Sequence, residues 1–303
     1  AIIFVSHYLL EVKDICDHVF VLRDGIVALD NPIKETSVDD LIKAMIGKSL
    51  DRQYPKEHLK IGEKIFGVEK LSKEKAFQNI SFDLHEGEIL GIVGLAGCGK
   101  NELIRALYGI EKPDRGEIRF RDKNLTLGDM KDALKNKIAF LPADRKSEGI
   151  FNIKSVGWNM LVASLDLITR NFWMSSREES QIAGSYIDKL KIKAKSSEQV
   201  ISSLSGGNQQ KVMLARWLLT DPEILLLEDP TRGIDVNVKT EVYKLITEFV
   251  KSGHAVIMVS SDEDEVVEMC DRVIVMRNGL ISADVNAADT NVEQIKKYSE
   301  KQG

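Results

Sequence analysis

The sequence is poor in the residue types that mark several specialised classes of protein. It has only 3 cysteines and 6 prolines among 303 residues, which excludes a disulfide framework, a cysteine zinc cage and a proline-rich extended chain. Charged residues interrupt every apolar run before it reaches the roughly 18 to 20 residues that span a bilayer. The net charge of -5 provides no general basic field for nucleic acid or anionic lipid. We therefore expect no nucleic acid partner.

The residues that are present indicate a packed globular fold. Apolar residues make up 43% of the chain and charged residues 29%, the balance of an ordinary folded protein. At about 150 residues per domain, the length predicts roughly two domains. Residues 1–7 are apolar but lack a basic leader and a small-residue cleavage site, which argues against a signal peptide.

Residues 1–30 recur near the C-terminus. Shifted by 254 positions, they align without a gap with residues 255–284, and thirteen of the thirty positions are identical. Two unrelated amphipathic segments would not share so many positions. We infer that the chain contains parts of two copies of one domain, and we expect most of the first copy to lie outside this sequence.

The spacing of apolar residues predicts alternating strands and helices. Each copy of the repeat is predicted to form a short strand (2–5 or 256–259), a helix and a hairpin. This alternation implies an α/β fold with a mainly parallel sheet. The other predicted elements are helices over 38–46, 102–108, 158–167 and 177–190, strand alternation over 66–84, and buried strands over 89–93 and 223–227.

A polar, charged stretch with one proline, residues 51–63, separates the two copies and is the best linker candidate. The predicted organisation is therefore a remnant of the first domain over 1–50, this linker, and a second domain over 64–303. A helical insert is expected at about 150–205 within the second domain.

A glycine-rich loop follows the buried strand at 89–93. Residues 94–101, Gly-Leu-Ala-Gly-Cys-Gly-Lys-Asn, match the pattern G-x-x-x-x-G-K between a strand and a helix. Glycines let successive backbone N–H groups face a phosphate, and the helix N-terminus adds a partial positive charge. Lys100 would reach the outer phosphates. The predicted nucleotide-binding residues are Gly94, Ala96, Gly97, Cys98, Gly99, Lys100 and Asn101.

Two further motifs follow at characteristic distances. Residues 204–211, Leu-Ser-Gly-Gly-Asn-Gln-Gln-Lys, open an amphipathic helix, and the hydrophobic strand at 224–227 ends in Glu228-Asp229-Pro230. Together with residues 142–149 and 230–235, they resemble the C-terminal part of the tandem ABC-transporter ATPase subunits that power monosaccharide importers of the ribose, galactose and xylose type. The resemblance covers nearly the whole chain.

The resemblance implies a P-loop NTPase ABC cassette with a mainly parallel core sheet, an N-terminal antiparallel β subdomain and a helical subdomain. It also implies ATP and Mg²⁺ as cofactors, and Asp235 in a loop that joins two cassettes. A signature segment would close over the γ-phosphate held by an opposite cassette, a role that suits a serine and backbone N–H groups at a helix N-terminus. The implied signature residues are Ser205, Gly206, Gly207, Asn208 and Gln209.

Three of the positions implied to hold the metal and the attacking water depart from the family pattern. Asn101 replaces a Ser or Thr that would ligate Mg²⁺, which tolerates little departure from octahedral geometry. Glu228 and Asp229 reverse the usual order of an Asp for the metal and a Glu for the water. Asp229, at the degenerate base position, would fall about 1 Å short of the water, an error that can cost ~100-fold in rate.

Two further positions depart in the same direction. Ser261 stands where the family has a switch histidine, which the first copy retains as His7. Ala143 stands where many cassettes place a glutamine, and it can ligate nothing. We expect a weak or inactive ATP site in this cassette, with weak Mg²⁺ binding at Glu228 and Asn101. Its signature would serve the active site of the first cassette.

The resemblance also implies partners and a location. The partners are integral-membrane permease subunits, the first cassette of the same chain or a second copy, and indirectly a solute-binding protein. The location is the cytoplasmic face of the cell membrane. Asp144, Arg145 and Lys146 either line a groove for a permease helix or form a solvated loop.

Three alternatives remain open at this point. The chain could be a non-catalytic regulatory ATP-binding module, or a cassette of a nucleoside or autoinducer importer. A soluble cassette acting on ribosomes or DNA is disfavoured, because the sequence lacks a long charged insert and coiled-coil heptads.

Overall fold

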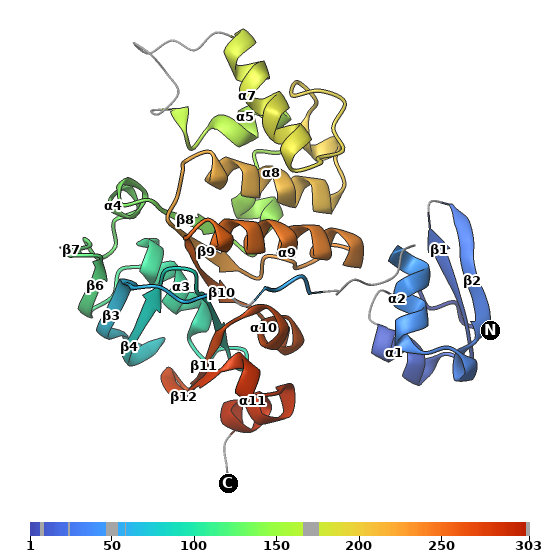
Figure 1. Ribbon diagram of the computed structural model, residues 1–303, viewed down its shortest axis with the longest axis horizontal. Helices are drawn as coiled ribbons and strands as arrows, with labels where there is room; N and C mark the ends of the chain where they lie inside the picture. Colours follow the sequence, from blue (N-terminus) through green and yellow to red (C-terminus); the bar gives the residue numbers. More distant parts are fainter. Residues whose placement is uncertain (7–8, 24, 47–53, 58, 166–175, 301–303) are drawn as a thin grey trace.

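The computed structural model describes residues 1–6, 9–23, 25–46, 54–57, 59–165 and 176–300. Its largest sheet has six strands in the order β12-β11-β5-β10-β9-β8 (Figure 1). Five strands run parallel, and β12 pairs antiparallel with β11 at one edge, which confirms the predicted mainly parallel sheet. The strands are β5 Ile89–Val93, β8 Ile138–Leu141, β9 Ile224–Glu228, β10 Ala255–Val259, β11 Arg272–Arg277 and β12 Leu280–Asn286.

A second, antiparallel sheet has the strand order β4-β3-β6-β7. The strand alternation predicted over 66–84 forms two of these strands, joined by a turn at residues 74–76. The four strands are β3 Lys64–Lys73, β4 Phe77–His85, β6 Arg115–Phe120 and β7 Lys123–Asn124.

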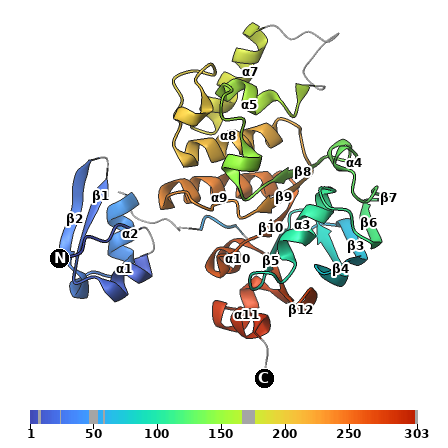
Figure 2. The same ribbon diagram turned by 180° about the vertical axis from the view of Figure 1, so that it is seen from behind.

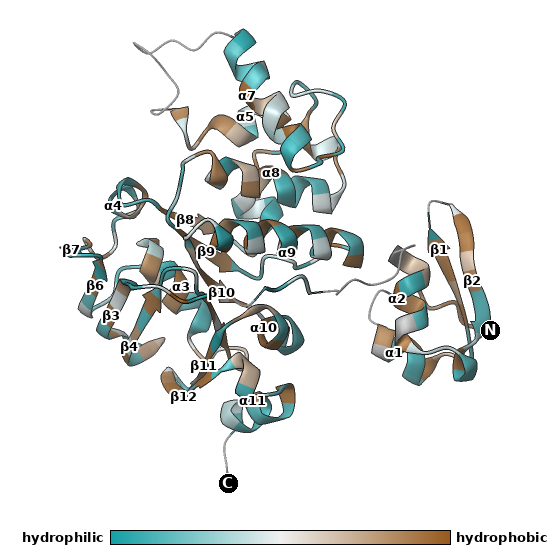
Figure 3. Cartoon of the chain, in the orientation of Figure 1, coloured by the Kyte–Doolittle hydropathy of each residue, from teal (hydrophilic) through white to brown (hydrophobic). Residues whose placement is uncertain are grey.

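Side chains from the parallel sheet pack into two separate hydrophobic clusters, one on each face. Because successive side chains of a strand point to opposite faces, Leu90 and Ile257 pack with α3 Lys100–Tyr108 and the antiparallel sheet. Val256 packs on the other face with α8 Gly206–Leu218. Figures 1 and 2 show α3 and α8 on opposite sides of the sheet, and Figure 3 shows hydrophobic residues along its strands.

The remaining helices of this unit cover the same two faces. On the α8 side, α9, α10 and α11 pack directly on the sheet, while α5 packs on α8 and α7 packs on α5, and both belong to the helical insert. No helix in the described part of the chain is both long and apolar enough to cross a membrane. The bounds are α4 Met130–Lys135, α5 Val156–Leu161, α7 Ser176–Lys189, α9 Val236–Lys251, α10 Glu263–Met269 and α11 Val292–Ser299.

The prediction of one helix over 158–167 was wrong about where the helix ends. Helix α5 ends at Leu161, because the backbone N–H and the hydroxyl of Ser164 both donate to the Leu161 carbonyl, at 3.0 and 3.1 Å. These local bonds replace the next helical turn. Residues 166 and 167 of the prediction lie outside the described residues.

The elements of the first copy recur 254 positions later with nearly identical bounds. The first copy forms α1 Leu9–Ile15, β1 His18–Arg23, β2 Ile26–Pro32 and α2 Val38–Ile46, and these correspond to α10, β11, β12 and α11. Even the irregularity in strand pairing recurs, after Val21 in one hairpin and after Val275 in the other. The first copy also has a hydrophobic cluster of its own, which includes Val12 and Leu41.

The strand predicted over 2–5 was wrong. Residues 1–6, which the structure describes, form no strand, and Ile2 is 94% exposed. The corresponding residues of the second copy form β10, which is hydrogen-bonded between β5 and β9. Residues 2–5 have the same apolar sequence pattern but lack these neighbours, and a strand needs a partner to satisfy its backbone groups.

The described residues of the predicted linker, 54–57 and 59–63, contact the second copy. The Tyr54 ring lies 5.3 Å from the ring of Tyr243 on α9. Lys56 Nζ lies 3.2 Å from Asp271 Oδ1, and both side chains are largely buried. This segment is therefore held on the larger unit by an aromatic contact and an ion pair.

Candidate functional site

The loop between β5 and α3 can be built only with glycine at two positions. Gly94 has φ 150° and Gly99 has φ 96°, values that side chains rarely adopt. A Cβ on Gly94 would lie 2.2 Å from the Met276 carbonyl oxygen, and one on Gly99 would lie 2.2 Å from the Ala76 carbonyl oxygen. Strand β11 and the turn before β4 thus lie directly against the loop backbone, which fixes its course into α3.

The tip of the loop is exposed, and the Lys100 side chain folds back to the residue at which the loop begins. Ala96 and Gly97 are exposed, whereas the Cys98 side chain is buried in the core. Lys100 is buried, and its Nζ donates to the Gly94 carbonyl at 2.8 Å. The predicted loop residues therefore combine an exposed backbone, a helix N-terminus and one amine, which together attract a phosphate.

Both carboxylate oxygens of Glu228, at the end of β9, accept hydrogen bonds from protein donors. Its Oε1 accepts from Asn101 Nδ2 at 2.9 Å and from Arg105 Nε at 3.1 Å. Its Oε2 accepts from Arg105 Nη2 at 2.9 Å and from the Ala143 N–H at 3.3 Å. These hydrogen bonds raise the pKa of Arg105 above its ordinary value, so the guanidinium stays charged.

This arrangement does not fit a Mg²⁺ ion. A carboxylate has about four lone-pair positions, and all four of those on Glu228 accept from Asn101, Arg105 and Ala143. The Asn101 amide, the other predicted ligand, turns its nitrogen toward Glu228. A guanidinium cation thus lies against the carboxylate that the resemblance assigns to the metal.

Asp229 and Ser261 are brought together and bond each other. Oδ1 of Asp229 accepts from the Ser261 N–H at 2.7 Å and from the Ser261 hydroxyl at 2.9 Å. Asp229 has φ 43° and is largely buried, and aspartate tolerates this backbone region better than most residues. The predicted base position and the predicted switch position are therefore hydrogen-bonded to each other through one carboxylate oxygen, Oδ1. His7, the switch residue of the first copy, lies outside the described residues.

The predicted signature residues form the N-terminus of α8. Ser205 is exposed, and its hydroxyl makes no capping hydrogen bond to the described first turn of this helix. It accepts instead from Asn208 Nδ2 at 2.8 Å. A Cβ on Gly207 would lie 2.6 Å from a methyl carbon of Val238. The first-turn N–H groups and the Ser205 hydroxyl therefore form a donor-rich helix end.

Residues 142–149 connect the residues around the glycine loop to the predicted signature residues. At one end, Arg105 Nη2 reaches Glu148 Oε2 at 3.0 Å. At the other, Arg145 Nε donates to Gln209 Oε1 at 3.0 Å. One short loop thus bonds both to the helix that follows the glycine loop and to the signature helix.

Asp235, predicted to lie in a loop that joins two cassettes, has a local structural role in this chain. It is exposed and caps α9, with Oδ1 accepting from the Val238 N–H at 3.1 Å. Such a cap stabilises a helix by about 1 kcal/mol.

The sequence interpretation missed Arg105 as a member of the site. The signal was available, because Arg105 follows Asn101 by one helical turn and so lies on the same helix face. Its partner Glu148 was read only as part of a motif, since pairing across 43 positions leaves no local trace.

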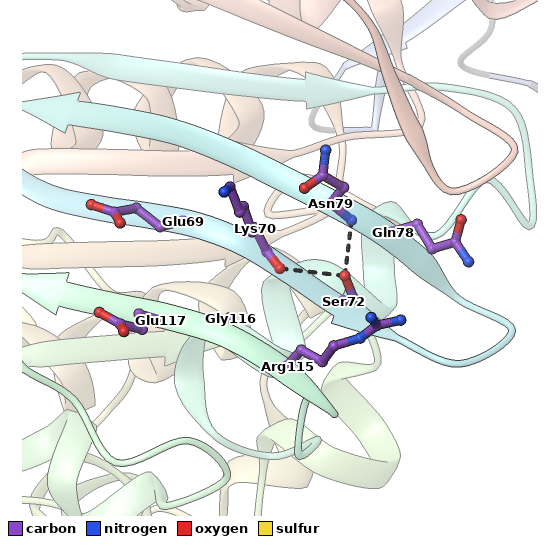
Figure 4. A pocket seen from close by; sticks show the side chains of 8 residues that line it. All are labelled: Glu69, Lys70, Ser72, Gln78, Asn79, Arg115, Gly116 and Glu117. Carbon is purple, nitrogen blue, oxygen red and sulfur yellow. Dashed lines mark hydrogen bonds between the residues drawn. The ribbon is translucent and has the colours of Figure 1, made fainter.

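One hollow on the described surface lies away from these residues. It has a volume of about 650 Å³ and lies on the antiparallel sheet (Figure 4). The Ser72 hydroxyl in it already donates to the Lys70 carbonyl and accepts from the Asn79 N–H. We assign no role in nucleotide binding to this hollow.

Comparisons with known proteins agree with this geometry. The family model described as ABC transporter matches residues 77–232. Ribose import ATP-binding protein RbsA of Clostridium tetani is 41% identical over 299 residues, which are 98% of this chain and 59% of that protein. Galactose/methyl galactoside import ATP-binding protein MglA 1 of Photobacterium profundum is 39% identical over 297 residues, 97% of this chain and 60% of that protein. The chain spans about three fifths of the length of these relatives.

Solved structures match over the larger unit. A nucleotide-free ATP-binding cassette from an ABC transporter has a TM-score of 0.65 at 21% identity, covering 79% of this chain and 96% of that chain. The structure of cbiO1 from Clostridium perfringens, part of the ABC transporter complex cbiONQ, has a TM-score of 0.64 at 26% identity, covering 77% of this chain and 93% of that chain. The chain belongs to the ABC transporter family and has the fold of its ATP-binding cassettes.

Proposed function

We propose that this chain is part of the ATP-binding subunit of an importer that uses ATP to take up a sugar of the ribose or galactose type. The import functions named for the relatives, which match nearly all of this chain, support this assignment. So does the loop at 94–101, with its exposed N–H groups, helix N-terminus and buried Lys100.

Within that subunit, residues 64–303 are the second ATP-binding cassette, residues 1–50 the end of a first one, and residues 51–63 the linker. The recurrence of α1, β1, β2 and α2 as α10, β11, β12 and α11 supports this organisation. Two copies of one domain in one chain would supply both halves of a nucleotide sandwich.

The cassette holds ATP at a degenerate site and donates its signature to the site of the first cassette. The observation that supports this proposal is that α3, which follows the glycine loop, and α8, which Ser205 precedes, lie on opposite faces of one sheet (Figures 1 and 2). The Ser205 helix end is exposed and belongs to the layer on the opposite face of the sheet from α3. It is therefore available to a nucleotide that another cassette presents.

Slow or absent hydrolysis follows from how the acidic residues are engaged. Glu228 is saturated by donors, and Asp229 is bonded by both polar groups of Ser261. A general base must instead be within hydrogen-bond reach of the attacking water. The partners of the assembled importer are membrane permease subunits and, indirectly, a solute-binding protein, and the subunit works at the cytoplasmic face of the membrane.

The test uses the whole ATP-binding subunit assembled with its permease. Ser205→Arg places a bulky cation at the donated helix end and is expected to lower ATP turnover more than 100-fold. Asp229→Asn removes only a degenerate base and is expected to leave turnover within about twofold. Equal large losses from both variants would contradict the asymmetric assignment.

A non-catalytic regulatory module is the second candidate, and the saturated Glu228 favours it. The same experiment separates the two functions. In a purely regulatory cassette, Ser205→Arg would leave turnover unchanged.

A further inference from the structure

The cation that contacts Glu228 belongs to a protein side chain, that of Arg105. The Arg105 guanidinium bonds Glu228 through Nε and Nη2, one to each carboxylate oxygen. The same Nη2 also reaches Glu148. Paired N–H bonds of this kind fix both position and orientation. Arg105 is therefore held in place before any nucleotide arrives.

We propose that Arg105 takes the place of Mg²⁺ in this cassette, so that the site binds the phosphates of a nucleoside triphosphate without a divalent cation. This inference rests on the proposed nucleotide binding and goes beyond it by naming the cation that neutralises Glu228. The triphosphate would meet Lys100 and the N-terminus of α3, with the charge of Glu228 already balanced by Arg105.

The replacement of Mg²⁺ by Arg105 accounts for three residues that depart from the family pattern, namely Glu228, Asn101 and Ala143. A glutamate is one methylene longer than an aspartate, so Glu228 reaches the guanidinium with both oxygens. The Asn101 amide donates to that carboxylate, which a ligand to a metal would not do. Ala143 contributes only its backbone N–H, which is again a donor. Among the described residues, the groups that contact Glu228 are thus donors and not metal ligands.

A divalent ion added to this arrangement would meet two obstacles. It would have to displace hydrogen bonds from a carboxylate that is only 1% exposed, and Mg²⁺ requires near-ideal octahedral coordination. It would also lie beside a guanidinium that is always charged. The arrangement therefore disfavours the metal both geometrically and electrostatically.

The test measures the dissociation constant of ATP by calorimetry on the 303-residue chain, in millimolar MgCl₂ and again in EDTA. For the wild type, the two constants are expected to agree within about threefold, less than 1 kcal/mol. Arg105→Ala is expected to weaken binding in EDTA more than tenfold and to make binding depend on MgCl₂. Arg119→Ala, an equal charge change at an exposed pair on β6, should behave as the wild type.

The outcomes distinguish this inference from the function on which it rests. Wild-type binding that is more than tenfold weaker in EDTA than in MgCl₂ would overturn the arginine exchange and leave nucleotide binding intact. Binding in neither buffer would overturn nucleotide binding itself. The wild-type comparison decides the matter even if Arg105→Ala does not fold.

Discussion

Gly97 and Gly99 are two residues apart in one loop but are required for different physical reasons. Both have positive φ values. A Cβ on Gly97 would meet nothing within 4 Å, whereas one on Gly99 would meet backbone at 2.2 Å. The first glycine therefore supplies only conformational freedom, and the second also permits close packing against β4.

This difference predicts unequal losses of stability. Gly97→Ala should lower the free energy of unfolding by about 1 kcal/mol, the usual cost of a left-handed alanine. Gly99→Ala should lower it by more than about 2 kcal/mol, because the clashing atom is a backbone oxygen that cannot move aside. Urea denaturation of both variants measures the difference, and equal losses would contradict the packing of the loop.

Glu265 on α10 is a buried carboxyl whose burial raises its pKa above the ordinary value of 4.5. Hydroxyls of Ser260 and Thr231 donate to it, and charges on Lys239 and Asp262 also act on it. Above pH 4.5 the unfolded carboxyl ionises readily, while the native one still holds its proton. Stability is therefore lost as the pH rises through the folded-state pKa.

Glu265→Gln removes this titration and keeps a similar shape. The stability of the wild type minus that of the variant should fall as the pH rises from about 4.5 toward neutrality. Denaturant unfolding of both proteins over this range gives the difference at each pH. A difference that stays constant would show that Glu265 does not titrate in this way.

At the scale of elements, local patterns predicted most of the strands and helices but not their long-range partners. The bounds of β5 and α2 were predicted as they occur, because continuous apolar runs and amphipathic spacing act locally. The extent of α5 was wrong because Ser164 ends it, and residues 2–5 were wrongly predicted as a strand because pairing depends on neighbours.

In the candidate site, too, the local motif was predicted from the sequence and the long-range contacts were not. Its glycines and Lys100 follow a local motif, so the sequence placed them together. The pairs Arg105 with Glu228 and Asp229 with Ser261 join residues 123 and 32 positions apart. Only the tertiary arrangement of β9, β10 and α3 brings these residues into contact.

Arg216 on α8 joins three elements and provides a test at this scale. Its guanidinium donates to the carbonyls of Asn159 and Gly149, at 2.6 and 2.8 Å. Burial lowers the pKa of Arg216 to about 10. It therefore remains charged at neutral pH and bonds α8 to α5 and to the end of the loop at 142–149.

Arg216→Met should destabilise the chain by on the order of 3 kcal/mol, since it leaves buried carbonyl oxygens without a donor. Lys244→Ala, on the exposed face of α9, is the control and should have little effect. The measurement is the urea midpoint of each variant. Equal midpoints for Arg216→Met and the control would contradict this role.

At the scale of the whole molecule, the segment at 54–57 is anchored to the larger unit. The largely buried pair of Lys56 with Asp271 lies next to β11. Lys56→Ala leaves a buried carboxylate without its cation and should cost about 3 kcal/mol. It should also speed amide exchange over residues 54–57, whereas Lys60→Ala, at an exposed position, should do neither. Unchanged exchange in Lys56→Ala would contradict the anchoring.

The central claim is that one cassette can bind ATP while lacking the geometry to hydrolyse it. Calorimetric titration of the 303-residue chain with ATP, and phosphate release from the same preparation, test this claim directly. The account predicts saturable binding of one nucleotide per chain, with phosphate release no faster than in a protein-free blank. Sustained turnover that disappears in Asp229→Asn would contradict it.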